Sequence, residues 1–353
     1  MPVRDGCYPA GALRLNREAK MTKTSSRGIV VALATASALI LGGCAADTGS
    51  TGGDQPAAEV DPRSPEVSDL TVAGYPQGPF TPVIAAEEAG VSAEYGISVT
   101  LQPAENAPAM LAQIISGDVP IGAVNGFFSV PAALGGADVR VIGEVIRGIP
   151  KGQTIEVLPD SGIDSAKDLE GKTVAVVGIN SGHHARVAKA VILDGGDPDK
   201  VEFVSLTWAE MVPSLEQGTV DAIAVTGNFM FAAQNDLGTK TIIDLGDGPF
   251  KEFPDAQWLA NGAWVDANPN TVAAFQCAIV LAGAKLVNDD RSVYEDALRS
   301  FGYSEDAIKA DLKLIHPEAN DPVQIIPDLM YELGWIDQEF DMASITVPLP
   351  TNC

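Results

Sequence analysis

The chain has 353 residues, of which 47 are acidic and 22 are Lys or Arg, and its formal net charge is −25. So acidic a surface repels nucleic-acid phosphates and anionic lipid headgroups, which excludes nucleic-acid binding and membrane adhesion through the protein surface. The chain is longer than a single hydrophobic core usually accommodates, which indicates two domains.

The amino-terminal segment has the layout of a secretory signal. A cationic stretch over 20–27 precedes an uncharged run over 28–43, whose apolar part is shorter than the roughly 20 residues that a membrane-spanning helix needs. We therefore expect translation to begin at Met21 and the mature protein to lack residues 1–43. Their removal takes away six basic and two acidic side chains and changes the formal net charge to −29.

The signal ends in Leu-Gly-Gly-Cys at 41–44, which resembles the bacterial lipobox, where a diacylglyceryl group is attached to the Cys. The stretch that follows is rich in Gly, Ser, Thr and Pro and holds almost no large apolar side chains. These features predict a bacterial lipoprotein, acylated at Cys44, held outside the cytoplasm by its lipid anchor alone, with a flexible tether over 44–68. The alternative is an ordinary cleavage site with an incidental Cys.

The four Cys residues agree with export. Cys7 precedes the expected start and Cys44 would be acylated, so Cys277 and Cys353 remain. In an oxidising compartment two remaining thiols indicate one disulfide, which here would tie the carboxyl end to a helix. Two unpaired structural Cys residues are the alternative.

From residue 69 onward, short apolar runs alternate with segments of helical periodicity. The first block has strands at 70–74, 97–101, 119–124 and 139–146 and helices at 80–89, 106–116 and 127–134. The second block has strands at 173–178, 201–206 and 220–225 and helices at 182–194 and 209–217. These are followed by a strand at 241–245, an apolar run at 258–265, and helices at 270–288, 291–301, 305–315 and 322–333.

This alternation predicts an α/β fold in which each block forms a largely parallel sheet with helices on its faces. We expect the chain to return to the first block near 250–265, so that two crossings make a hinge. The predicted domains are lobe 1, residues 69–149 plus 251–353, and lobe 2, residues 150–250.

The two blocks are similar in sequence. Residues 117–126 and 218–227 align at a shift of 101 residues, and at the same shift Met110 meets Met211. The similarity indicates two related lobes, although any helix-Gly-strand-Gly unit would give a comparable match.

Four motifs resemble the nitrate, sulfonate and taurine-binding family of periplasmic solute-binding proteins, which includes binders of thiamine-pyrimidine precursors. They are Asp-Leu-Glu-Gly-Lys-Thr-Val-Ala-Val at 168–176, Ser-Gly-His-His at 181–184, Gly-Thr-Val-Asp-Ala at 218–222 and Asn-Pro-Asn-Thr-Val-Ala-Ala-Phe at 268–275. The resemblance covers roughly 69–340. It implies a type II periplasmic-binding-protein fold, a ligand in the cleft between the lobes, and delivery to an ABC permease and its ATPase.

The chain departs from this family at one point. Where many members carry a Trp-Asp-Pro-like stretch, residues 225–229 read Val-Thr-Gly-Asn-Phe. The departure affects the transfer of ligand identity more than the fold.

Ligands of open parallel sheets bind beyond the carboxyl ends of the strands. Ser181 can cap the helix that begins at 182, so that the free N–H groups of Gly182 and His183 face a negative ligand. A helix cap without a ligand is the alternative. The predicted ligand-binding residues are Tyr75, Gln77, Asn125, Phe127, Ser181, Gly182, His183, Trp208 and Asn228.

Charged side chains are scarce near this predicted site. The basic candidates are Arg147, Lys151 and Arg186, so we expect neutral donors and the helix end to hold an anionic head. Aromatic residues at the strand ends would enclose a flat or apolar ligand body.

The histidines do not predict a metal site. His183 and His184 point about 100° apart on a helix, and His316 lies far along the chain. One imidazole would bind the ligand and the other would be solvated. We expect no metal and no cofactor.

These inferences predict the monomeric substrate-binding lipoprotein of an ABC importer, which captures a sulfonate, taurine or nitrate-like anion or a small aromatic or heterocyclic compound. The sequence has no Gly-x-Ser-x-Gly elbow, phosphate-binding loop or reactive Cys/His cluster, so we expect no catalysis. Two alternatives remain, an enzyme of pyrimidine-precursor synthesis on the same fold and a ligand-sensing lipoprotein without a transport role.

Overall fold

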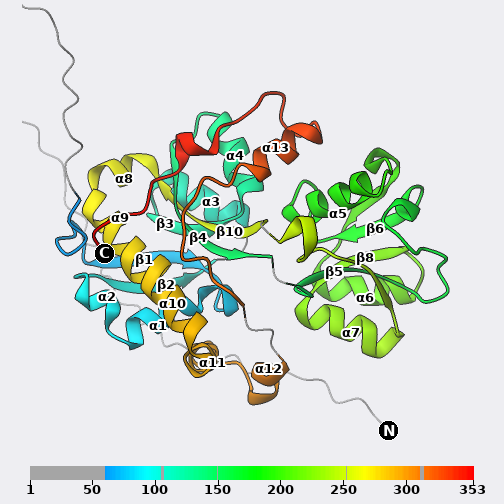
Figure 1. Cartoon of the computed structure of the whole chain (residues 1–353), viewed down its shortest axis with the longest axis horizontal. Helices are drawn as coiled ribbons and strands as arrows, with labels where there is room; N and C mark the ends of the chain where they lie inside the picture. The colour runs from blue at the N-terminus through cyan, green and yellow to red at the C-terminus, as the bar shows by residue number, and fades with distance from the viewer. Residues whose placement is uncertain (1–59, 105–106, 149, 252, 311–313) are drawn as a thin grey trace, which may run out of the picture. The chain divides into compact units, whose positions relative to one another are not determined.

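The computed structural model describes residues 60–104, 107–148, 150–251, 253–310 and 314–353 (Figure 1). These residues belong to one compact unit, Pro56–Cys353. The predicted signal region and Cys44 lie outside the described residues.

Two five-stranded sheets organise the unit, and both have the same plan. The first has the order β2-β1-β3-β10-β4, formed by β1 (Asp69–Gly74), β2 (Ser98–Pro103), β3 (Ile121–Val124), β4 (Val139–Arg147) and β10 (Pro254–Asn261). The second has the order β7-β6-β8-β5-β9, formed by β5 (Gln153–Val157), β6 (Thr173–Val176), β7 (Glu202–Ser205), β8 (Ala222–Thr226) and β9 (Lys240–Asp244).

In each sheet four strands run in one direction and one strand, β10 or β5, runs opposite to them. In the first sheet β1 pairs in parallel with β2 and β3, whereas β10 runs antiparallel to β3 and β4. In the second sheet β6 pairs in parallel with β7 and β8, whereas β5 runs antiparallel to β8 and β9. Ile121 and Ala222, which align in the sequence repeat, begin their paired segments in β3 and β8, and Met110 and Met211 are both fully buried.

Helices lie between strands, as the alternation predicts, and further helices follow the last strand. The helices before β10 are α1 (Thr81–Glu88), α2 (Val91–Glu94), α3 (Ala107–Ser116), α4 (Gly126–Leu134), α5 (Gly182–Leu193), α6 (Trp208–Glu216) and α7 (Gly227–Leu237). Those after it are α8 (Gly262–Ala267), α9 (Pro269–Phe275), α10 (Ala284–Asp289), α11 (Arg291–Ser300), α12 (Glu305–Ala310) and α13 (Ile325–Glu332).

The chain passes between the sheets twice. It leaves the first sheet where β4 ends at Arg147, and it returns between the end of β9 at Asp244 and the start of β10 at Pro254. This strand membership supports our proposed division into 69–149 plus 251–353 and 150–250.

Three elements differ from the sequence-based expectation. Strand β5 was not expected, because Gln153, Thr154 and Glu156 are polar although all three are buried in the structure. Helix α7 occupies the aromatic segment after β8, where no element was expected. In addition, β10 begins earlier than the apolar run at 258–265 and passes into α8.

The described end of the predicted tether is bound to the first sheet's helices. The Glu66 carboxylate accepts hydrogen bonds from the N–H groups of Asn270 and Thr271 (3.1 and 2.7 Å), at the start of α9. The Asp61 N–H donates to Asn270 Oδ1 (2.8 Å). The first N–H groups of a helix have no acceptor within the helix, and Glu66 supplies acceptors to those of α9. Residues 60–68 are therefore fixed here and differ from the flexible tether that their composition predicts.

One helical run among the described residues, Pro269–Asp289, is long and apolar enough to span a membrane by length and composition. It comprises α9, the π-helical segment Gln276–Gly283 and α10. Because 72% of its most apolar 18-residue stretch is buried inside the protein, this run is buried as a core helix is.

Cys277 of this run is joined to Cys353 by a disulfide, with a Cα–Cα distance of 5.4 Å. The tail near Cys353 is also hydrogen-bonded, since Asn320 Nδ2 and Gln276 Nε2 donate to the Val347 carbonyl (2.5 and 3.3 Å).

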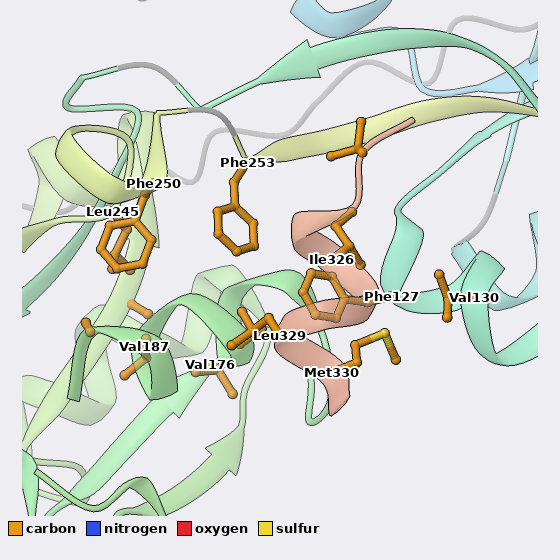
Figure 2. Packing of buried hydrophobic residues seen from close by; sticks show 14 of the residues in the cluster. Phe127, Val130, Val176, Val187, Leu245, Phe250, Phe253, Ile326, Leu329 and Met330 are labelled. Atoms are coloured by element: carbon orange, nitrogen blue, oxygen red, sulfur yellow. The ribbon is translucent and has the colours of Figure 1, made fainter. Parts of the chain in front are cut away.

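One buried apolar cluster contains residues from both sheets and from α13. Figure 2 shows part of it, with Phe127 of α4 beside Ile326, Leu329 and Met330 of α13. Elements of the first sheet therefore contact those of the second through packed side chains as well as through the two crossings.

Candidate functional site

A pocket of about 340 Å³ is lined by residues of both sheets and their loops. Its apolar wall is formed by Pro79, Ile146, Trp208, Phe231, Leu245 and Leu314. Its polar or charged side chains are Gln77, Asn125, Arg147, Gln153, His183, Arg186, Thr226 and Asp255. A mostly apolar concavity with a few polar groups is typical of a small-molecule site.

Five of the predicted ligand-binding residues line this pocket: Gln77, Asn125, Gly182, His183 and Trp208. The sequence therefore brings the start of α5 together with loops of the first sheet. The strand-end rule places these residues on one cavity although up to about 130 residues separate them along the chain.

Three predicted residues lie elsewhere. Phe127 is buried in the core, with its ring centroid 6.0 Å from that of Trp335. Tyr75 packs edge-on against Phe80, and burial raises the pKa of its hydroxyl. Ser181 is buried and is not among the lining residues, although the helix that it caps is.

Asn228 is the second residue of α7, directly after the lining residues Thr226 and Gly227, and its side chain lies outside what the structure describes. It remains a proposed contact.

The turn before α5 sets up the amino end of this helix. Asn180 has φ 58°, a left-handed conformation that Asn tolerates better than most residues. Ser181 Oγ then accepts the His184 N–H (3.3 Å) and donates to the Gly178 carbonyl (2.6 Å). The N–H groups of Gly182 and His183 have no acceptor among the described residues, so the helix presents two donors and its positive end.

His183 and His184 differ in their surroundings. The His183 ring lies edge-on to Trp208 at 5.0 Å, and burial together with the Arg186 charge lowers its pKa to about 3. His183 is therefore neutral at physiological pH.

His184 is buried, and the expectation that one imidazole would be solvated is wrong. Its Nδ1 accepts the Asn180 N–H (2.9 Å), and its ring lies 4.1 Å from that of Phe203 and 4.7 Å from that of Trp335. Burial lowers the pKa of His184 to about 4.

Arg186 stands one turn further along α5, on the same face as Gly182 and His183. Its side chain is only 2% exposed. It donates through Nη1 to Gln153 Oε1 (2.6 Å) and through Nη2 to the Phe253 carbonyl (3.4 Å), and its guanidinium carbon lies 5.4 Å from the centre of the Phe253 ring. Arg186 Nε and Gln153 Nε2 are both buried and have no hydrogen-bond partner among the described residues. Both groups can only donate, and both belong to side chains that line the pocket.

Asp255 is the anionic partner of Arg186, and the two form an ion pair between α5 and β10. The register of β10 against β4 shifts between Pro254 and Ala256, so Asp255 lies at a bulge. Bulges redirect side chains and are frequent next to functional sites. Asn125 fixes this bulge, because its Nδ2 donates to the Asp255 carbonyl (2.7 Å) while its Oδ1 accepts the Phe127 N–H (2.9 Å).

Arg147 is the second cation of the pocket. Its Nε and Nη2 donate to the two oxygens of Glu144, each at 2.6 Å, and the Glu144 side chain is fully buried. Lys151 is not among the lining residues, and its N–H donates to Asp244 Oδ2 (2.7 Å).

The expectation that neutral donors and a helix end alone would serve an anion is therefore incomplete. Two guanidinium groups line the pocket, each paired with a carboxylate. Sequence reasoning named Arg147 and Arg186 only as nearby basic candidates, and it did not name Gln153 or Asp255. A lone Arg one turn after Gly182, on a helix with an apolar stripe, was the available signal for Arg186.

Aromatic side chains form part of the wall. Trp208 stacks on Phe229 with the ring centroids 5.8 Å apart and the planes at 16°. Trp208 opens α6, where Thr207 and Glu210 form a capping box that fixes the first turn. A flat or apolar ligand body would find its contact area here.

Among the described ranges, no group of three or more His, Cys, Asp or Glu residues could hold a metal ion. The polar groups of the pocket are donors and charges that suit an organic or inorganic ligand.

A family model described as NMT1/THI5 like matches residues 77–290, which is more than half of the chain. The chain belongs to the NMT1/THI5-like family. This confirms the family resemblance that its motifs indicate. The matched segment of this NMT1/THI5-like chain includes nearly all of the pocket lining. The comparison with curated proteins gives no match.

Solved structures share the fold. The periplasmic aliphatic sulphonate binding protein from Escherichia coli matches with a TM-score of 0.64 at 20% identity, over 79% of this chain and 97% of that one. The periplasmic nitrate-binding protein from Synechocystis PCC 6803 matches with a TM-score of 0.62 at 14% identity, over 80% and 86%. The desulfurization enzyme DSZB matches with a TM-score of 0.59 at 15% identity, over 80% and 97%.

These matches confirm the predicted α/β periplasmic-binding-protein fold with two sheets. Because the identities are low and both binding proteins and an enzyme share the fold, the ligand and activity must be inferred from the pocket.

Proposed function

We propose that this NMT1/THI5-like protein is the substrate-binding component of an ABC importer and binds a small organic ligand in the pocket between its sheets. The observation that carries the proposal is the pair of buried, unpartnered donors, Arg186 Nε and Gln153 Nε2, beside the amino end of α5. A buried donor without an acceptor costs about 1–3 kcal/mol, and a ligand acceptor would recover part of that cost.

The ligand head is an anion or a strong hydrogen-bond acceptor. Arg186 offers a permanent positive charge, and the free N–H groups of Gly182 and His183 add donors at the positive end of α5. The ligand body is apolar or aromatic, because Trp208 and Phe231 face the same pocket. The names of the matched sulphonate and nitrate binders support an anionic head but do not choose among sulfonate, taurine-like, nitrate and heterocyclic ligands.

The proposed site residues are the predicted contacts Tyr75, Gln77, Asn125, Phe127, Ser181, Gly182, His183, Trp208 and Asn228, revised by the geometry. Tyr75, Phe127 and Ser181 do not line the pocket and act as its supports, while Arg186, Gln153 and Asp255 join the direct contacts.

The proposed setting is outside the cytoplasm, where the monomeric protein is anchored through lipid on Cys44 and passes its ligand to a permease and its ATPase. The names of the matched periplasmic binding proteins support this setting. The predicted signal and lipobox give the anchor its chemical basis.

Ligand binding is a better explanation of the pocket than catalysis. The described lining residues include no Ser or Cys nucleophile, and His183 is held neutral with Trp208 against its ring. The shared fold of DSZB keeps an enzyme as the alternative. Turnover of a bound compound would favour that alternative.

A thermal-shift screen of sulfonates, carboxylates, nitrate, pyrimidines and aromatic acids tests the proposal. A ligand of the folded state adds about 2.7 kcal/mol at a hundredfold excess over its dissociation constant, so a true ligand raises the unfolding temperature measurably. If no compound with an acidic or strongly accepting head stabilises the protein, the proposed function is wrong.

A further inference from the structure

Each arginine that lines the pocket is paired with a carboxylate before any ligand enters. Arg186 is paired with Asp255, and Arg147 is paired with the buried Glu144. His183, the remaining titratable side chain of the lining, is neutral near pH 7, because its pKa lies at about 3. A simple anion would therefore bring an uncompensated charge into a partly buried site, which is costly.

Asp255 can take a second partner. One carboxylate oxygen is paired with Arg186, whereas the other has no hydrogen-bond partner among the described residues. The side chain is 37% exposed and lines the pocket, so a ligand can reach it. A carboxylate accepts hydrogen bonds only, and a cationic donor makes the strongest of them.

The bulge in β10 is what brings Asp255 to this place. Asn125 Nδ2 donates a hydrogen bond to the Asp255 carbonyl. Because the register shifts at this point, the Asp255 side chain does not follow the regular alternation of the two sheet faces. The pocket thus has donors at Arg186 and Gln153 for an acidic group, and an acceptor at Asp255 for a basic one.

We propose that the natural ligand is a zwitterion, carrying an acid group and an amine, and that Asp255 is the specificity-determining residue that binds the amine. The inference rests on the proposed function and narrows its ligand class. An acid group contacts Arg186 Nε and Gln153 Nε2, the ammonium contacts Asp255, and the ligand adds no net charge to the site. The acid group is a carboxylate or a sulfonate, which the experiment separates.

Calorimetry with the full chain of 353 residues and matched compounds tests this proposal. The pairs are 4-aminobutyrate with pentanoate, 3-aminopropanesulfonate with butanesulfonate, and 4-(aminomethyl)benzoate with 4-ethylbenzoate. Within each pair a methyl group replaces the ammonium, so size and shape are conserved. A third member, in which a hydroxyl replaces the ammonium, separates charge from hydrogen bonding.

We expect at least one zwitterion to bind at least about 10-fold more tightly than both its methyl and hydroxyl analogues, the discrimination that a hydrogen bond to a charged group provides. The series with the larger effect identifies the acid group. Equal or tighter binding of the methyl or hydroxyl analogue in all three series overturns the inference and leaves the proposed function standing. Absence of binding by every compound, with no hit in the thermal-shift screen, overturns both.

Asp255→Asn provides a second test, with Asp266→Asn as its matched control. Asp266 is an exposed residue of α8 in the same domain, away from the pocket, so its replacement removes one negative charge without touching the lining. Asp255→Asn should bring the ratio of zwitterion to anion affinity to about 1, whereas Asp266→Asn should retain the wild-type ratio. If folded Asp255→Asn retains the wild-type ratio of zwitterion to anion affinity, Asp255 does not have the proposed role. If that variant does not fold, the comparison of the matched compounds on the wild-type protein decides the ligand class.

Discussion

Arg186 of α5 and Asp255 of β10 form an ion pair that joins a helix of the second sheet to a bulged strand of the first. Arg186 is buried and Asp255 is partly exposed, so the position of the arginine is the more tightly fixed of the two. Gln153 and the Phe253 carbonyl occupy two further sides of the guanidinium group. The pocket is thus built around a fixed cation whose Nε is buried and has no hydrogen-bond partner among the described residues.

Gly182→Ala should weaken ligand binding several-fold while the protein remains folded. A Cβ at this position would lie 3.1 Å from Asn125 Nδ2 and 3.4 Å from a ring carbon of Phe127, so the two sides of the pocket must move apart. Gly178→Ala is the control, because its Cβ would meet nothing closer than 3.6 Å. Calorimetry on both variants measures the effect. Equal losses in the two variants would show that the close approach at Gly182 is unimportant.

Cys353→Ser should lower the free energy of unfolding by up to about 4 kcal/mol, the chain-entropy limit for a loop closed over 76 residues. Denaturant unfolding of the oxidised protein measures the loss. Because the tail keeps its hydrogen bonds to Gln276 and Asn320, the tail should stay folded at neutral pH. Peptide mapping without reduction should recover Cys277 and Cys353 in one linked peptide. Alkylated Cys277 in the unreduced protein would argue that the two thiols are free.

His184 should make the protein less stable as the pH falls. Burial lowers its pKa from 6.5 to about 4, so between these values the unfolded chain binds a proton that the folded protein does not. The free energy of unfolding therefore rises with pH across this window, and His184 alone accounts for about 3 kcal/mol between pH 4 and 6.5.

His184→Gln isolates this contribution. The variant loses packing against Phe203 and Trp335, so its stability at pH 7 will fall, and the slope against pH is the quantity to compare. Denaturant titrations from pH 4 to 7 should give a shallower slope for the variant than for the wild type. Parallel curves would mean that His184 titrates normally in the folded protein.

Cys44→Ala should release the protein from the membrane. Cys44 lies outside the described residues, and the prediction rests on the lipobox-like sequence at 41–44. Cell fractionation should find the wild type in the membrane and the variant in the soluble extracytoplasmic fraction, and mass spectrometry should find an acylated Cys at the mature amino-terminus. A mature terminus at another residue would reject lipid anchoring at this site.

The alternation of apolar runs and helical periodicity predicted most of the fold, because both depend on burial that the sequence displays directly. Strand β5 escaped prediction for the opposite reason. Glu156 of β5 is fully buried, yet its carboxylate accepts hydrogen bonds from the hydroxyls of Thr239 and Thr241 (2.8 and 2.5 Å) and from Gln234 Nε2 (3.2 Å). These partners come from α7, from β9 and from the turn between them, so nothing local to the strand marks it as buried.

The candidate site was predictable only in part. The strand-end rule found Gln77, Asn125, Gly182, His183 and Trp208, because parallel strands bring their carboxyl ends to one edge. Asp255 could not be found this way, since it begins an antiparallel strand and depends on a bulge that tertiary pairing creates. Phe127 was misplaced because a strand-end aromatic can turn inward, as it does here against α13 (Figure 2).

Calorimetry of Arg186→Gln, with the best-stabilising compound from the screen, tests the proposed binding site most directly. Arg140→Gln is the matched control, because Arg140 of β4 pairs with Asp138 and neither residue lines the pocket. We expect Arg186→Gln to raise the dissociation constant roughly 10- to 100-fold, the worth of a charge-assisted hydrogen bond, and Arg140→Gln to leave it unchanged. An unchanged dissociation constant in folded Arg186→Gln would contradict anion binding at this residue.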